Sequence, residues 1–137
     1  MAVFNKFDQL KEDIGLKVHN FDTDTLKVYL TNAAPSASGD AVKADLAEIA
    51  AGNGYTAGGA DVSGVWSEAA GVATLVGTDI VWTATTGSIG PFRYAVLYND
   101  TSPSDSLIGW WDYGSPVTAI AAQTITVDFG ASILQLS

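Results

Sequence analysis

Hydrophobic and polar residues alternate with a period of two over much of the chain after residue 25. This period is typical of β-strands, because successive side chains of a strand point to opposite faces. The clearest alternation covers residues 92–99, and a second apolar run at 107–113 follows a turn-rich segment. The two runs predict a long-looped hairpin at the centre of a sheet. One face of its first strand is expected to hold Phe92, Tyr94, Val96 and Tyr98.

Shorter patterns of the same kind predict the rest of the fold. The expected strands cover residues 26–31, 65–69, 72–76, 80–84, 124–129 and 133–136. Together with the hairpin they make eight or nine short strands, bounded by turns rich in Gly, Ser, Thr and Asp. We therefore predict an all-β fold, an antiparallel β-sandwich of jelly-roll or immunoglobulin-like type. Its strand order cannot be derived from the pattern.

The N-terminal segment differs, because its apolar residues fall at helical spacing. Phe4, Phe7, Leu10 and Ile14 predict an amphipathic helix over about residues 4–14 that ends near Gly15. Either these residues cap the protein's own core, or residues 1–18 form an arm that docks on a neighbour while 19–137 form the β-sandwich domain. The arm hypothesis predicts that the β-domain stays folded when residues 1–18 are removed. A further helical turn or two is expected within residues 42–49.

Composition limits the possible functions. At 137 residues and 47% apolar content, the chain can form one domain with a substantial core. Only 15% of residues are charged, which is typical either of a surface covered by a partner or of a sandwich coated with Ser, Thr and Gly. The formal net charge of −9, with every lysine at or before Lys43, argues against binding nucleic acid through phosphates. We expect no membrane span and no signal peptide, and synthesis in a cytoplasm.

No set of residues with a catalytic pattern stands out. The chain has no Cys, and its single histidine, His19, lies in a polar connector where we expect a solvated or capping role. Two acidic segments, 22–24 and 99–105, fit side-chain turns better than a calcium loop. The glycine-rich loop at 52–59 lacks the Lys and the context of a phosphate-binding loop. We therefore expect no cofactor, no metal and no enzymatic activity.

The segment from Trp110 to Tyr113 is the one aromatic cluster that suggests binding. Neighbouring strand residues face opposite ways, so either one of Trp110 and Trp111 enters the core while the other faces out, or both are buried between layers. An outward Trp111 with Tyr113 beside it would form a platform for sugar stacking or an interface hot spot. Packing within the core is the more common role of such residues.

Three blocks of sequence together resemble a known group of proteins. The blocks are residues 48–59 (EIAAGNGYTAGG), 90–100 (GPFRYAVLYND) and 108–114 (IGWWDYG), with a final VDFG at 127–130. In combination they resemble a group of small virion proteins of tailed bacteriophages, over nearly the whole chain. The resemblance implies a non-enzymatic structural protein, in particular a capsid decoration (cement) protein on the outer shell. Such proteins are usually β-sandwiches or barrels and often trimers, and the resemblance implies no catalytic residue.

Partners and contact residues follow from this resemblance as expectations. The expected partners are the major capsid protein, bridged at its subunit joints, and further copies of the chain itself. The expected location is the capsid surface of the virion. Two alternatives are a tail or neck protein of the virion and a carbohydrate-binding module that uses Trp111 and Tyr113. The loop at residues 52–59 is an expected contact element. The candidate contact residues are Phe4, Phe7, Leu10, Tyr55, Trp66, Arg93, Trp110, Trp111 and Tyr113.

Overall fold

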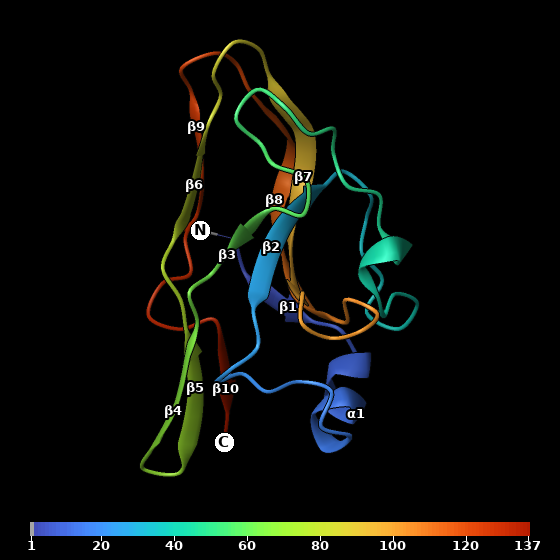
Figure 1. Cartoon of the computed structure of the whole chain (residues 1–137), viewed down its shortest axis with the longest axis vertical. Helices are drawn as coiled ribbons and strands as arrows, with labels where there is room; N and C mark the ends of the chain where they lie inside the picture. The colour runs from blue at the N-terminus through green and yellow to red at the C-terminus, as the bar shows by residue number, and fades with distance from the viewer. Residues whose placement is uncertain (1) are drawn as a thin grey trace.

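A computed structural model describes residues 2–137 and shows a mostly β protein, with 45% of residues in strands and 7% in helices (Figure 1). The strands are β1 (Phe4–Lys6), β2 (Leu26–Thr31), β3 (Ala60–Asp61), β4 (Val65–Ala69), β5 (Val72–Val76), β6 (Ile80–Thr83), β7 (Ile89–Asn99), β8 (Leu107–Ala119), β9 (Thr124–Val127) and β10 (Leu134–Leu136). The helical elements are α1 (Gln9–Gly15) and the 3-10 turn η1 (Lys43–Asp45). No helix within the described part is long and apolar enough to cross a membrane.

The strands form two layers of antiparallel sheet, as Figure 1 shows. The first layer is a five-stranded sheet in the order β1-β8-β7-β2-β3. The second contains a three-stranded sheet, β10-β5-β4, and a strand pair, β6-β9. Because β5 leads into β6 and β9 into β10, the second layer is a long two-stranded ribbon with β4 added at one end. The predicted all-β sandwich is confirmed. The structure adds the strand order, which could not be derived from the sequence pattern.

Apolar side chains pack on both faces of the five-stranded sheet. The larger cluster, with Leu75, Trp82 and Trp111 among its members, includes the residues between the two layers. The smaller cluster includes Tyr29 and Tyr98 from the opposite sheet face. It is covered by the loop segments around α1 and η1, which lie beyond the sheet in Figure 1. The two clusters explain why β2 and β7 are buried along almost their whole length.

The N-terminal segment departs from the predicted helix over residues 4–14. Residues Phe4–Lys6 form strand β1, which pairs with β8 opposite residues 109–111, and α1 begins only at Gln9. Phe7 and Leu10 have exposed fractions of 0% and 1%. They cap the protein's own core, as one alternative predicted, rather than lying on a separate arm. A spacing of three residues is typical of a helix, but here the apolar residues are divided between strand β1, the turn that follows it and the start of α1.

The central hairpin is confirmed, but the predicted face of its first strand is wrong at one end. Tyr94 and Tyr98 belong to the smaller cluster, whereas Phe92 belongs to the cluster between the layers. The cause is an irregular register, in which Phe92 pairs with Val117 while Tyr94 pairs with Asp112. β8 has extra residues between these two pairs, which form a bulge. Phe92 and Tyr94 therefore point to opposite faces of the sheet, although strict alternation would place them on the same face.

The remaining predictions differ only in their boundaries. Strands β2, β4 and β5 match the predicted ranges, whereas β6, β9 and β10 are shorter by one or two residues. The predicted helical turns at 42–49 appear as the short η1. Besides β1, the two-residue strand β3 was not predicted. The two strands of the hairpin are longer than predicted, because β7 begins at Ile89 and β8 continues to Ala119.

Candidate functional site

Four of the nine candidate contact residues lie in the interior. Phe7, Leu10, Tyr55 and Trp111 have exposed fractions between 0% and 4%. They stabilise the fold, and little of their surface is exposed. The other five residues are partly buried, and each packs against or pairs with a neighbour in the chain.

The two adjacent tryptophans occupy opposite faces of β8, as strand geometry predicted. Trp111 lies in the core, with its ring 4.8 Å from that of Phe4. Trp110 is half-buried on the other face, 4.6 Å from the ring of Phe7. Tyr113 packs edge-on against Phe92, and burial together with the charge of an aspartate raises its pKa to about 12. Because Trp111 is buried, it does not provide the open platform that a sugar-stacking role requires.

Arg93 forms an ion pair that closes the irregular part of the central hairpin. Its Nε donates to Asp112 Oδ1 at 2.8 Å, and a second guanidinium nitrogen donates to Oδ2 at 3.1 Å. The backbone of Gly114 also donates to Asp112 at 2.7 Å. These hydrogen bonds, led by that of Arg93, hold the pKa of Asp112 below its usual value. Arg93 therefore orders the hairpin within the chain.

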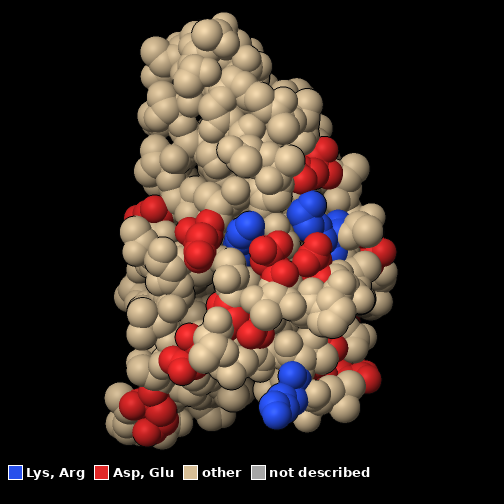
Figure 2. Space-filling view, in the orientation of Figure 1, with Lys and Arg blue, Asp and Glu red and all other residues tan. Residues whose placement is uncertain are grey.

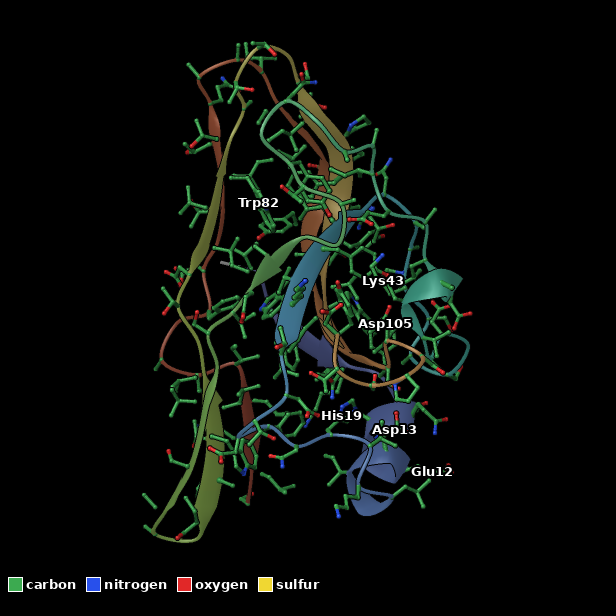
Figure 3. All side chains as sticks on the ribbon, viewed as in Figure 1. Glu12, Asp13, His19, Lys43, Trp82 and Asp105 are labelled. Atoms are coloured by element: carbon green, nitrogen blue, oxygen red, sulfur yellow. The ribbon has the colours of Figure 1, made fainter. Side chains whose placement is uncertain are left out.

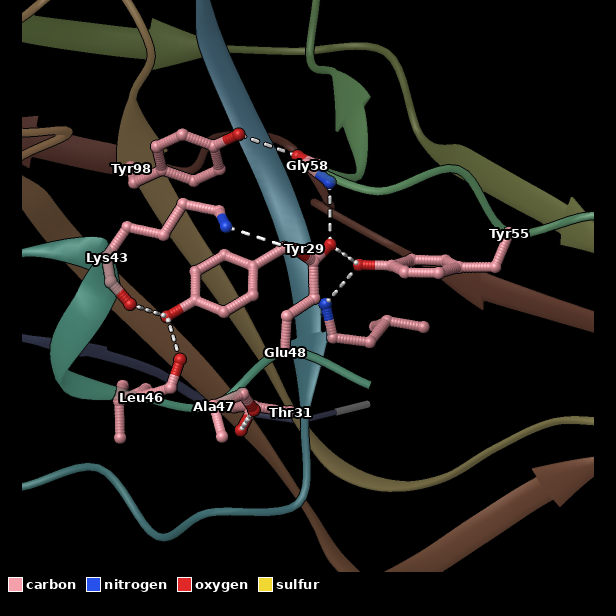
Figure 4. A network of polar contacts seen from close by, with 10 residues as sticks. Tyr29, Thr31, Lys43, Leu46, Ala47, Glu48, Tyr55, Gly58 and Tyr98 are labelled. Carbon is pink, nitrogen blue, oxygen red and sulfur yellow. Dashed lines mark hydrogen bonds and ion pairs between the residues drawn. The ribbon is translucent and has the colours of Figure 1, made fainter. Parts of the chain in front are cut away.

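Tyr55 belongs to a polar network around Glu48, drawn in Figure 4. The Glu48 carboxylate accepts hydrogen bonds of 2.7 Å from both the Tyr55 hydroxyl and the Gly58 amide. It also forms an ion pair of 3.1 Å with Lys43. Burial is the main cause that raises the pKa of Tyr55, followed by its bond to Glu48. The network fastens the glycine-rich loop to β2, because the Leu30 amide donates to the Tyr55 hydroxyl at 3.0 Å.

His19 is buried, which contradicts the predicted solvated or capping role. The Asn99 side-chain amide lies 3.0 Å from Nδ1, and Nε2 has no hydrogen-bond partner within the described structure. Asp13 is 3.8 Å from Nε2, on the α1 side of the ring, as Figure 3 shows. Burial lowers the pKa of His19, and the charges of Asp13 and Asp24 oppose this shift. The contact with Asn99, at the end of β7, joins the connector that holds His19 to the sheet.

The acidic and Asn-rich turns are structural, as predicted. The buried Asn99 side chain accepts from the amides of Thr101 and Ser102 and donates to Asp24. These contacts tie the loop between β7 and β8 to the connector at residues 19–25. Within residues 2–137, no group of three or more His, Asp or Glu side chains is arranged to hold a metal ion.

One end of the molecule carries no charged side chain. Three runs of sequence, 49–60, 80–92 and 113–127, contain no Asp, Glu, Lys or Arg. Backbone hydrogen bonds join them, from Ala84 to Gln123 and from Thr85 to Asn53. We call these three runs together the charge-free end. Figure 2 shows it as the uncharged upper part of the molecule, with all visible acidic and basic groups below.

Apolar side chains are exposed at the charge-free end. Val81 and Ile120 have exposed fractions of 56% and 57%, and Val117 one of 36%. Protein interfaces are depleted of charged residues at their centres, and exposed apolar groups favour burial against a partner. The charge-free end therefore has the composition of a contact surface. It also includes the glycine-rich loop that was expected to make contacts.

This surface was not predicted from the sequence, although the three uncharged runs that form it are visible there. Each uncharged run can be recognised in the sequence, but their meeting at one end depends on the pairing of β6 with β9 and on the loop contacts between residues 53 and 85. Local patterns do not report such long-range neighbours. Comparisons of the chain with protein-family models, with curated proteins and with solved structures found no match.

Proposed function

We propose that this chain is a non-enzymatic structural protein of a tailed-phage virion that decorates the capsid exterior. In this role it bridges neighbouring subunits of the major capsid protein, and copies of the chain associate with one another. The proposal starts from the resemblance of the blocks at residues 48–59, 90–100 and 108–114 to small virion proteins. It names no catalytic residue and no cofactor.

The charge-free end is the observation that carries the proposal. A chain with a formal net charge of −9 keeps one end entirely neutral and exposes Val81, Val117 and Ile120 there. A protein that only had to remain soluble would gain from charges at such a place. Their absence from three separate runs favours a surface that is covered in the assembled particle.

The proposed mechanism is burial of this end across a joint between two capsid subunits. Each Å² of apolar surface removed from water contributes roughly 25 cal/mol. Separation of the two subunits would first have to expose that surface again, so the joint is stabilised. The network around Glu48 holds the loop at residues 52–59 in shape, which reduces the entropy lost on binding.

Quantitative mass spectrometry of purified virions tests the proposed function. The ratio of this chain to the major capsid protein is the measured quantity. We expect a ratio near one chain per capsid subunit, or per local symmetry position of the shell. A far smaller number, as for a tail or neck component, would contradict the capsid role, and absence from the virion would contradict the whole proposal.

A further inference from the structure

A second, different surface lies between α1 and the three-stranded sheet, away from the charge-free end. Two adjoining hollows share the walls Ile14, Trp66 and Leu136, and the larger has a cavity volume of about 250 Å³. Phe21 and His19 line the larger hollow, and Leu10 lines the smaller. Three exposed lysines, Lys6, Lys11 and Lys17, also contribute to the walls. We call the whole surface the lysine-rimmed groove.

The basic groups of the groove differ from those elsewhere in the chain. Lys27, Lys43 and Arg93 each form an ion pair with an acidic side chain at 3.3 Å or less. By contrast, Lys6 and Lys17 have no acidic partner among the described residues, and Lys11 meets only Asp8 at 3.6 Å in an exposed pair. Among the described lysines, the two without an acidic partner, Lys6 and Lys17, therefore both line this apolar groove.

The acidic side chains of α1 and β4 form no ion pair with these lysines. Asp13 is buried beside His19 and accepts a hydrogen bond from Gln9. Glu68 on β4 accepts from the Gly71 amide of its own hairpin at 2.8 Å. Figure 3 shows Glu12 on the side of α1 that faces away from β10. An incoming carboxylate would therefore meet unpaired ammonium groups at Lys6 and Lys17.

Two open strand edges border the same groove. β10 is the end strand of the three-stranded sheet, and β1 is the end strand of the five-stranded sheet. All three residues of β10 line the smaller hollow, with Lys6 of β1 among the opposite walls. An edge strand presents backbone groups that can pair with a further extended chain.

We propose that the lysine-rimmed groove binds an extended segment of another polypeptide, in which apolar residues alternate with carboxylates. The segment adds to the open edge of β10. Its apolar side chains enter the groove against Trp66 and Leu136, and its carboxylates pair with Lys6 and Lys17. A second copy docked groove to groove about a twofold axis would place lysines against lysines, which the charges disfavour. This inference depends on the groove alone and not on the virion assignment.

Three capped synthetic decapeptides test the proposal by isothermal titration calorimetry with the full chain. Their patterns are alternating Leu and Asp, alternating Leu and Lys, and alternating Ser and Asp. We expect binding of the Leu–Asp peptide only, because the groove needs both apolar contact and negative charge. Raising the salt concentration from about 0.02 M to about 0.5 M should weaken this binding severalfold, since exposed charges are screened.

Two double variants with the same change of charge locate the binding site. Lys6→Gln with Lys17→Gln removes two positive charges at the groove, and we expect the affinity for the Leu–Asp peptide to fall about fivefold or more. Ser115→Glu with Ala121→Glu adds two negative charges at the exposed opposite end, and we expect little change. Hydrogen exchange at residues 134–136 should slow when the peptide binds, because β10 then gains a neighbouring strand.

The following outcomes would overturn the proposal. They are failure of the Leu–Asp peptide to bind, equal binding of the Leu–Lys peptide, equal affinity of the two double variants, and unchanged exchange in β10. Self-association in sedimentation, together with slow hydrogen exchange at residues 134–136 without any peptide, would replace the foreign segment by a second copy. Each of these results leaves the copy number in virions untouched, so the groove and the proposed function can fail separately.

Discussion

At the scale of single residues, Glu48 is a side chain that holds the glycine-rich loop in place. It accepts from Tyr55 and Gly58 and pairs with Lys43. Hydrogen bonds to a charged group contribute about 1.5–3 kcal/mol each. We therefore expect Glu48→Gln to lower the free energy of unfolding by roughly 1–3 kcal/mol, since the amide accepts less strongly and loses the ion pair. Chemical denaturation measures this.

Tyr55→Phe is the matched comparison for Glu48→Gln. It keeps the buried ring and removes only the hydroxyl, which bonds to Glu48 and to the Leu30 amide. We expect a smaller loss than for Glu48→Gln. A Glu48→Gln protein as stable as the wild type would show that the network does not hold the loop.

His19 should make stability depend on pH. Burial lowers the pKa of the ring in the folded chain, so the unfolded chain binds more protons once the pH falls below the ordinary value of about 6.5. The free energy of unfolding is therefore expected to decrease from pH 7 to pH 5. Asp13 and Asp24 favour the charged ring and reduce the effect without reversing its sign.

Denaturation of the wild type and of His19→Gln at pH 7 and pH 5 checks this prediction. Asp45 and Asp112 also have a lowered pKa, but they affect stability only near and below their ordinary value of about 4. The pH 5–7 window therefore isolates His19. An equal loss of stability in the two proteins over that window would refute the assignment.

At the scale of elements, β1 depends on a glycine in its neighbour strand. Gly109 faces the Phe4 ring, and an added Cβ would collide with that ring and with the Asn5 carbonyl. We expect Gly109→Ala to displace β1 and to cost about 1–3 kcal/mol, the usual range for overpacking. Hydrogen exchange of residues 4–6 should then become faster. Unchanged protection there would contradict the packing described.

Removal of residues 1–18 should destabilise the whole protein. The deletion takes away Phe7 and Leu10, which are buried in the two clusters, and exposes the edge of β8. This expectation is opposite to that of the arm hypothesis. Thermal unfolding followed by circular dichroism measures it, and a truncated chain that unfolds cooperatively at the wild-type temperature would restore the arm.

The elements could be predicted from sequence to the extent that each has its own local pattern. Val28 and Leu30 alternate with polar residues, so β2 was predicted with the correct ends. The break in side-chain alternation after Phe92 could not be predicted from the local sequence, because a register shift changes neither the composition nor the length of the strand. The burial of His19 depends on Asn99, which is distant in sequence. The candidate contact surfaces were missed for the same reason.

At the scale of the whole molecule, charge separates two surfaces of different kinds. Binding through the charge-free end should respond weakly to salt, because no charged pair forms there. Binding through the lysine-rimmed groove should weaken as salt is added. Titration of both interactions over the same range of salt concentration checks this contrast. A shell affinity that falls steeply with salt would contradict contact through the neutral end.

The most direct test of the central claim compares two valines in binding to purified shells that lack this protein. Val81 and Val65 lie on strands β6 and β4 and have nearly equal exposed fractions, 56% and 57%, but only Val81 belongs to the charge-free end. With the folds of both variants verified by circular dichroism, cosedimentation measures shell binding. We predict that Val81→Asp loses binding by at least about tenfold and that Val65→Asp binds like the wild type. Equal binding of the two variants would contradict the claim that this end contacts the capsid.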